Sequence, residues 1–481
     1  MLVMGIDLGT SGTRVMVVDG SGHVIAGARA DLNAGPALQP GWREQDPLEW
    51  WRSLRRACRR ALTDLRSCGR QVNEIQAVSV TSTSGTVVLL DAFGVPLRPA
   101  LMYNDARSGA EGREVDEAGR ALWTRLGYRM NASFALPKLL WLKRHEPREF
   151  ERAHFFVHAA DYLAGRITGQ PGVSDFSNSL KAGYDLVGLR WPTDVLARLD
   201  LDPRLFPEVV APGEAMGSVS AEASTQLGLP KGIPVVAGMT DGCTSQIAAG
   251  AVRVGAWSTT IGTTLVVKGV SRSLICDPTG AVYCHRHPEG YWMPGGAGNT
   301  GGAILMERFG RQRLVSLSKR AHFPTGVLCY PLPGKGERFP FMCADAEGFT
   351  LGESGSEAEL FAAHLEGIAY VERLAYDRLA ALGAEVSGPV ASSGGGGASP
   401  VLLQVRADVL GRLLTLPETP EAGFGAAVIA AAHVTGTTLS DAAATMVRTV
   451  ATYEPRSALA GSYDDRYGRF IEALRERQYI E

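Results

Sequence analysis

The sequence predicts an α/β protein built from two lobes of related architecture. Short apolar runs alternate with amphipathic helical segments along most of the chain. One pattern, an apolar run, then glycine with hydroxyl residues, then a second apolar run, occurs at 3–18 and again at 256–270. A pattern that recurs in each half of a chain indicates a repeated structural unit. We therefore expect one lobe to span residues 1–248 and a second lobe to span 249–481.

Length and charge limit the class of protein. A chain of 481 residues is long enough for two or three domains. Its net charge of -2 offers no basic surface for nucleic acid or for an anionic membrane. No apolar run reaches the roughly 20 residues of a membrane span, and Asp7 stands where a signal peptide would be apolar. We expect a cytoplasmic protein that acts on a small molecule, without nucleic-acid or membrane partners.

The N-terminal half alternates strands with helices. Residues 3–8 and 14–18 predict an opening hairpin. Residues 46–69 predict a helix that begins at Asp46-Pro47 and ends at Gly69. Three more segments follow, predicting strand–turn–strand, helix, and strand entering helix: IQAVSVTSTSGTVVLLD, ALPKLLWLKRHEP and HFFVHAADYLAGRITG.

Near Pro234 the alternation begins again. IPVVAGMTDGCTSQIAAGA predicts a buried strand, a turn with a carboxylate and a helix of small residues, and the second hairpin follows at 256–270. The next segments predict strand–turn–helix, a long helix, strand–glycine run–helix, and a close-packing helix: YWMPGGAGNTGGAILMERFG, EAELFAAHLEGIAYVERLAYDRLAAL, PVASSGGGGASPVLLQVRADVLG and FGAAVIAAAHVTG. Residues 442–481 predict a charged, helical, solvated cover.

The two hairpin turns combine glycine with hydroxyl side chains. Consecutive backbone N–H groups in such a turn bind anions, and hydroxyls add donors without bulk. A single copy is most simply an ordinary hairpin turn, whereas two copies favour a shared polyphosphate ligand. Asp7 would repel phosphate unless a divalent cation lay between them, which favours a Mg²⁺ anchor acting through water. The turn residues are Thr10, Ser11, Gly12, Thr13, Gly262, Thr263 and Thr264.

Other phosphate motifs fit less well. Gly334-Lys335 is followed by Gly336, so no P-loop occurs. Residues 296–301 match GxGxxG, but no acidic residue stands near position 320 to hold a ribose. These glycines, Gly298 among them, would instead let the backbone approach a nucleotide phosphate at the following helix N-terminus.

Asp241 ends a buried apolar strand and precedes a helix. Ligands of α/β proteins lie at the carboxyl ends of parallel strands, and an acid in that place suits a general base. A helix N-cap for residues 242–250 fits the local sequence equally well.

In their order along the chain, these motifs resemble the FGGY carbohydrate kinases, which belong to the actin-like, sugar-kinase and heat-shock ATPase superfold. The resemblance covers residues 1–440. It implies a two-lobed actin-like ATPase (ribonuclease H-like) fold, with mixed sheets flanked by helices and a cleft between the lobes. The motifs are GIDLGTSGTR, GWREQDPLEWW, LMYNDAR, AGMTDGC, STTIGTTL, the glycine run with QVRADVLG, and GFGAAVIAAA.

The resemblance also implies an activity and roles for residues. It implies ATP- and Mg²⁺-dependent phosphorylation of the terminal hydroxyl of a pentulose such as D-ribulose or D-xylulose, and it allows a homodimer. Asp241 matches the catalytic base, and Asp7 matches the acid near Mg²⁺ and the reacting phosphate. The two hairpin turns match the phosphate hairpins. The adenosine loop would be Gly394, Gly395, Gly396, Gly397 and Ser399, and the sugar contacts Thr83, Ser84, Asn104, Asp105 and Asp241.

Two departures leave the substrate open. Residues 81–85 replace the Gln-Met-His-Gly segment usual in xylulokinases, and Thr-Asp-Gly-Cys is more similar to a ribulokinase-like branch from cyanobacteria and plants. That branch tends to have Asn and Trp where this chain has Ser399 and Leu402. The alternatives are a kinase of glycerol, erythritol or L-ribulose, and a nucleotide-driven switch ATPase of the same superfold.

Overall fold

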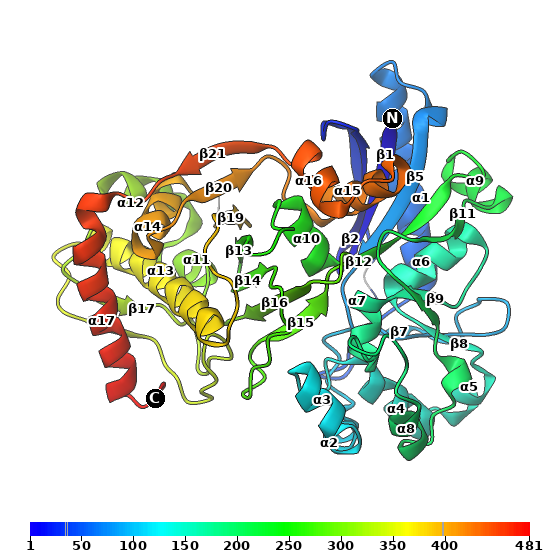
Figure 1. Cartoon of the computed structure of the whole chain (residues 1–481), viewed down its shortest axis with the longest axis horizontal. Helices are drawn as coiled ribbons and strands as arrows, with labels where there is room; N and C mark the ends of the chain where they lie inside the picture. Colours follow the sequence, from blue (N-terminus) through cyan, green and yellow to red (C-terminus); the bar gives the residue numbers. More distant parts are fainter. Residues whose placement is uncertain (34, 36, 397–398) are drawn as a thin grey trace. The chain divides into compact units, whose positions relative to one another are not determined.

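A computed structural model describes residues 1–33, 35, 37–396 and 399–481 (Figure 1). Gly397 of the expected adenosine loop lies outside these residues. The chain forms two compact units. Unit 1 comprises Met1–Ala248, His285–Gly290 and Glu421–Val447, and unit 2 comprises Ala249–Cys284, Tyr291–Pro420 and Arg448–Glu481.

Unit 1 is built on a six-stranded sheet with the order β11-β12-β5-β1-β2-β3. The strands β1 (Leu2–Gly9) and β2 (Gly12–Asp19) pair as an antiparallel hairpin, which confirms the expected opening hairpin. β5 (Ile75–Ser82) and β12 (Pro234–Thr240) run parallel to β1. The outer strands β3 (Val24–Asp31) and β11 (Ala215–Ser218) are antiparallel to their neighbours.

Helices cover both faces of this sheet. Leu2, Met4 and Ile6 of β1 share one buried apolar cluster with α1 (Pro47–Ser67) and α6 (Ala159–Thr168). Asp46 caps α1 by accepting from the Leu48 N–H, as expected. On the opposite face α15 (Ala422–Thr435) lies against β1 (Figure 1), and a Cβ on Gly5 would stand only 1.8 Å from the Gly423 carbonyl oxygen. Glycine at position 5 therefore permits this contact.

Unit 2 repeats the same sheet. Its strand order is β15-β16-β14-β13-β19-β20-β21. The series β16-β14-β13-β19-β20-β21 corresponds to β3-β2-β1-β5-β12-β11 in unit 1. Neighbouring strands at matching places in the two series are parallel or antiparallel alike. The structural repeat expected from the two hairpins is confirmed. The strands are β13 (Trp257–Ile261), β14 (Leu265–Gly269), β15 (Tyr283–Arg286), β16 (Trp292–Ala297), β19 (Val390–Ser393), β20 (Leu414–Pro417) and β21 (Thr449–Tyr453).

The expectation of a solvated helical cover over 442–481 is wrong in part. Residues 449–453 form β21, which pairs with β20. The helix α17 (Ala460–Glu476) buries Tyr463, Phe470 and Leu474 in a cluster with side chains of α13 (Glu357–Ala381) and α14 (Pro400–Leu410). Both features depend on partners distant in sequence, which a local charge pattern does not reveal.

Shorter elements complete the units. Those in unit 1 are β4 (Glu44–Gln45), β6 (Val88–Leu90), β7 (Ala100–Leu101), α2 (Gly109–Ala118), α3 (Arg120–Leu126), α4 (Ala135–His145), α5 (Pro147–Arg152), β8 (Phe155–Val157), β9 (Val173–Asp175), α7 (Phe176–Ser179), α8 (Thr193–Arg198), β10 (Glu208–Val210), α9 (Ala221–Leu227), α10 (Asp241–Ala248) and α16 (Leu439–Met446). Those in unit 2 are α11 (Ala303–Phe309), α12 (Leu314–Arg320), β17 (Leu328–Tyr330) and β18 (Phe349–Leu351).

Within the described residues, no single helix has both the length and the apolar composition to cross a membrane. Among the helices that the structure describes, the pair α15 and α16 meets those criteria when taken together, but the two helices are bent by 118° at the break between them.

Glu366 of α13 is a buried carboxylate that links three segments of unit 2. Its oxygens accept from Thr325 N at 3.0 Å and from Thr325 Oγ1 at 3.1 Å, and Arg466 of α17 lies 3.5 Å away. Burial raises the pKa of Glu366 to about 7, against the opposing charge of Arg466. Between the ordinary pKa of 4.5 and about 7, the folded state keeps a proton that the unfolded state has lost. Stability therefore falls as pH rises through this window.

The variant Glu366→Gln is expected to lack this loss of stability. As the pH rises from 4.5 to 8, the difference in free energy of unfolding between the variant and the wild type should shift in favour of the variant by up to about 3 kcal/mol. Urea denaturation at both pH values measures the difference, with Glu359→Gln near the start of the same helix as a control. A difference between variant and wild type that does not change with pH would contradict the prediction.

Candidate active site

The first hairpin turn exposes Thr10 and Ser11 and buries Gly12 and Thr13. A Cβ on Gly12 would lie 2.7 Å from the Ala30 carbonyl oxygen, so glycine lets β3 approach the turn. The buried Thr13 hydroxyl has no hydrogen-bond partner among the described residues. The turn therefore offers two exposed hydroxyls and one buried hydroxyl that bonds to none of the described residues.

Asp7 lies on β1 directly opposite Arg14 on β2. Its Oδ2 accepts from Arg14 Nη1 at 3.1 Å, and its side chain is only 6% exposed. Burial raises the pKa of Asp7, and Arg14 opposes that shift. The described residues contain no group of three or more His, Cys, Asp or Glu that could hold a metal. Mg²⁺ usually keeps several waters and binds one or two carboxylates plus phosphates, and a single carboxylate beside the turn fits that mode.

Asp241 is the first residue of α10 and follows β12 directly. β12 and β5 pair regularly as far as Ala237 and Val80, and then Thr240 pairs with Ser82. Gly238 and Met239 thus both face the single residue Thr81, which makes a β-bulge. Bulges redirect a strand and recur beside active sites.

Two threonine hydroxyls bond to backbone carbonyls around this bulge, and one glycine allows a close backbone contact there. Thr81 Oγ1 donates to the Met239 carbonyl at 2.6 Å, and Thr244 Oγ1 of α10 donates to the Asp241 carbonyl at 3.1 Å. A Cβ on Gly238 would lie 2.1 Å from the Val80 carbonyl oxygen, so any larger residue would displace the strand. The Asp241 side chain is partly exposed, and its Oδ1 accepts from Gly242 N at 2.7 Å.

The first turn of α15 brings Asp7 and the start of α10 to the same region of unit 1. A Cβ on Gly423 would lie 3.6 Å from Asp7 Cβ. A Cβ on Gly425, two residues further, would lie 1.9 Å from the carbonyl oxygen of Thr244 in α10. The glycines of the GFGAAVIAAA motif thus let one helix contact the surroundings of both expected acids.

The expected sugar contacts lie on two adjoining loops. A Cβ on Gly85 would lie 2.5 Å from the Ser133 carbonyl oxygen and 3.8 Å from Tyr103 Cβ, so the loop after β5 reaches the loop after β7. Thr83 and Ser84 are partly exposed on the first loop, and Asn104 is exposed on the second.

Asp105, on the same loop, is enclosed. Its Oδ2 accepts from Arg43 N at 2.6 Å, and its carboxylate forms a two-point ion pair with Arg107 at 2.8 and 2.7 Å. The Arg107 guanidinium lies 3.6 Å above the Trp42 ring and pairs with Glu44 at 2.8 Å. These contacts tie the GWREQ segment to the YNDAR loop. Sequence reasoning assigned no role to Arg107, although it belongs to the LMYNDAR motif.

In unit 2, three glycine segments meet at the end of β13. Gly302 N donates to the Gly262 carbonyl at 2.8 Å, Gly298 N to the Leu265 carbonyl at 2.9 Å, and Gly396 N to the Ile261 carbonyl at 3.0 Å. The turn residues Thr263 and Thr264 lie between these contacts along the chain. A Cβ on Gly262 or Gly395 would meet nothing within 4 Å, so both backbones border open space. The structure thus groups those expected nucleotide residues of this unit that it describes.

Ser399 and Leu402, where the chain departs from the family pattern, lie at the start of α14. Ser399 is the N-cap residue of α14 and donates its N–H to the Gly396 carbonyl at 3.3 Å. Leu402 is only 1% exposed and belongs to an apolar cluster with Ile261, Leu305 and Phe309. Leu402 is therefore a core side chain.

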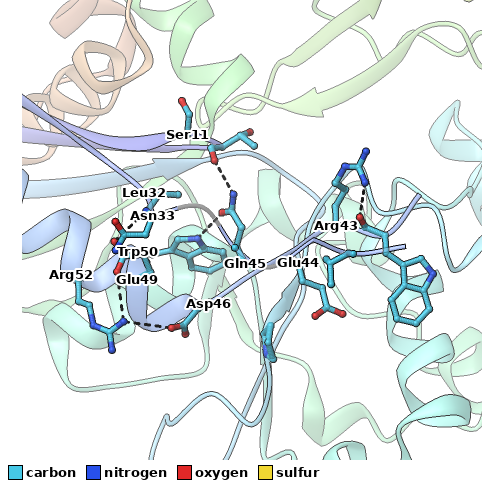
Figure 2. A pocket seen from close by; sticks show the side chains of 15 residues that line it. Ser11, Leu32, Asn33, Arg43, Glu44, Gln45, Asp46, Glu49, Trp50 and Arg52 are labelled. Atoms are coloured by element: carbon cyan, nitrogen blue, oxygen red, sulfur yellow. Dashed lines mark hydrogen bonds and ion pairs between the residues drawn. The ribbon is translucent and has the colours of Figure 1, made fainter. Parts of the chain in front are cut away.

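A pocket of about 640 Å³ lies beside the first hairpin turn (Figure 2). Gln45 points toward that turn in Figure 2, donating to the Thr10 carbonyl at 2.8 Å and accepting from Trp50 Nε1 at 2.8 Å. Asp7 and Asp241 do not line this pocket. It therefore adjoins the first turn without including the two expected acids.

Comparisons with known proteins identify the family of this chain. The N-terminal and C-terminal domain models of the FGGY family of carbohydrate kinases match residues 2–248 and 251–434. Xylulose kinase from Streptomyces coelicolor is 34% identical, covering 92% of this chain and 89% of its own. Xylulose kinase from Streptomyces rubiginosus is 33% identical, covering 90% and 88%. The structure of xylulose kinase from Rhodospirillum rubrum is 28% identical, with a TM-score of 0.88 over 99% of both chains.

Two units with matching sheets, each with a glycine–hydroxyl turn, form the actin-like ATPase fold, and the two domain matches make the protein a sugar kinase. The chain belongs to the FGGY family of carbohydrate kinases.

Proposed function

We propose that this kinase transfers the γ-phosphoryl group of ATP to the terminal hydroxyl of a pentulose, with D-xylulose as the preferred substrate. The relatives named above are xylulose kinases and match about nine tenths of the chain. The observation that carries the chemistry is a partly exposed carboxylate, Asp241, at the bulged end of a central parallel strand.

In the proposed reaction the Asp241 carboxylate takes the proton of the sugar hydroxyl. The hydroxyl oxygen forms a bond to the γ-phosphorus, the bond to the bridging oxygen breaks, and ADP leaves. A base in hydrogen-bond reach typically contributes about 10²–10⁴-fold to the rate. Thr83, Ser84 and Asn104 would bind the sugar, and Asp105 would hold the Asn104 loop through Arg107 and Arg43.

The glycine–hydroxyl turns would bind the phosphates. N–H and hydroxyl donors at 10–13 and 262–264 suit phosphate oxygens, and Gly298, Gly394–Gly396 and Ser399 would border the rest of the nucleotide. Asp7 would hold Mg²⁺ through water, and the ion would neutralise negative charge on the reacting phosphates.

A coupled assay of ADP release across a panel of sugars tests the proposal. The panel is D-xylulose, D-ribulose, L-ribulose, glycerol, erythritol and a control without sugar. We expect the highest kcat/KM with D-xylulose, because the relatives named above are xylulose kinases. Its isomers should give lower values, because a site built to hydrogen-bond particular hydroxyls rejects compounds that place them differently. A higher kcat/KM with another compound would overturn the substrate. ATP hydrolysis that no sugar stimulates would overturn the kinase reaction in favour of a switch ATPase.

A further inference from the structure

The backbone just before Asp241 is held by a side chain from another segment of unit 1. Thr240 N donates to Ser177 Oγ at 3.0 Å, and Ser177 is fully buried in α7. We propose that Ser177, fixed by Asp175, is a positioning residue that sets the orientation of the Asp241 carboxylate. This inference rests on the proposed function, in which Asp241 is the base.

The need for such a residue follows from the bulge. A regular ladder fixes each peptide plane through hydrogen bonds to the neighbouring strand, and the extra residue of β12 interrupts that ladder before Asp241. Side chains supply the missing constraint on both sides. Thr81 Oγ1 donates to the Met239 carbonyl, and Ser177 Oγ accepts from the next N–H along the chain, that of Thr240.

Asp175 determines which way the Ser177 hydroxyl points. Ser177 Oγ donates to Asp175 Oδ1 at 2.5 Å. A hydroxyl has a single proton, so once it donates to Asp175 its lone pairs are directed elsewhere, and Thr240 N uses one of them. The bonding sequence from Thr240 N–H through Ser177 O–H to Asp175 therefore has one direction.

Asp175 is itself immobilised. Its carboxylate accepts from Ser177 N at 2.7 Å, from Asn178 N at 3.1 Å and from Asn178 Nδ2 at 2.6 Å. Asp175 is 3% exposed, and Asn178 is fully buried. Because every member is buried and fixed by others, the sequence of bonds can transmit a defined position to β12.

Removing the Ser177 hydroxyl should lower the rate in a protein that still folds. A buried N–H without a partner lowers the stability of the folded state by an amount that a folded domain tolerates. A catalytic group displaced by about 1 Å can lose 10²-fold in rate. The expected signature is therefore a fall in kcat that is larger than the change in stability explains.

The test compares four variants of the full chain, at Ser177 and Ser179, with the wild type and with Asp241→Asn. Ser177→Ala removes the acceptor, and Ser177→Thr keeps the hydroxyl. Ser177→Cys keeps the shape with a weaker acceptor and takes the place of Ser177→Ala if that variant does not fold. Ser179→Ala is the matched control, because Ser179 is buried on the same turn and its hydroxyl donates to Ser174 Oγ. The measurements are kcat, KM for ATP, and Tm, with the best sugar of the panel.

We expect Ser177→Ala to lose about tenfold or more in kcat with KM for ATP unchanged, and Ser177→Thr to recover most of that loss. Ser179→Ala should keep its kcat at a similar Tm. Wild-type kcat in Ser177→Ala, or an equal loss in Ser177→Ala and Ser179→Ala, would overturn the inference. If Asp241→Asn also stays active, the base assignment in the proposed function fails. If Asp241→Asn is inactive while Ser177→Ala is normal, only the positioning role fails.

Discussion

The variant Asp241→Asn is expected to lose about 10²–10⁴-fold in kcat while its KM for ATP stays nearly unchanged. The amide has the size of the carboxylate and can still accept from Gly242 N, but it cannot take the proton of the sugar hydroxyl. The residues expected to bind the nucleotide lie on other segments of the chain. Steady-state kinetics with saturating sugar and varied ATP measure both quantities.

A purely structural role for Asp241 predicts a different result. Asp241 begins α10, and Asn stabilises a helix N-terminus about as well as Asp. The free energy of unfolding of the Asn variant should therefore lie within about 1 kcal/mol of the wild-type value. A loss of activity could then not be explained by unfolding of α10. Asp202→Asn is a suitable control, because Asp202 accepts from Arg204 N at the start of a 3₁₀ turn. Near-normal turnover in Asp241→Asn would refute the assignment.

Features set by adjacent residues were predictable from the sequence. The glycine–hydroxyl pattern predicted both hairpins, because turn chemistry and β-branched runs determine such structures locally. Asp46-Pro47 predicted the start of α1, because the capping side chain and the backbone it caps are close in sequence. The similarity of the hairpins also predicted the repeated sheet.

Features set by distant partners were not predictable. The bulge before Asp241 depends on the register between β12 and β5, which a single strand does not specify. The enclosure of Asp105 depends in part on Arg43, which is 62 residues away in sequence. The sequence Asp-Phe-Ser-Asn at 175–178 is typical of a capped helix start, so the bonds between Asp175 and the backbone of Ser177 were open to prediction. The contact of Ser177 with Thr240 required the fold.

Asp7→Asn is expected to fail in a different way from Asp241→Asn. The amide keeps a hydrogen-bond acceptor for Arg14 but removes the negative charge that would hold Mg²⁺. Metal-assisted charge stabilisation is worth several kcal/mol, so kcat should fall on the order of 10²-fold. The Mg²⁺ concentration for half-maximal rate should also rise, whereas in Asp241→Asn it should not.

The pH dependence gives this prediction a second readout. Burial raises the pKa of Asp7, and a cation binds the ionised carboxylate, so protons compete with Mg²⁺ as pH falls. The wild-type requirement for Mg²⁺ should therefore increase toward acid pH, and Asp7→Asn should lose that increase. Asp19→Asn is the matched control, because Asp19 lies at the far end of the same hairpin and bonds to Ser21 and His23. An unchanged Mg²⁺ titration in Asp7→Asn would remove Asp7 from the metal site and leave its carboxylate as the partner of Arg14 alone.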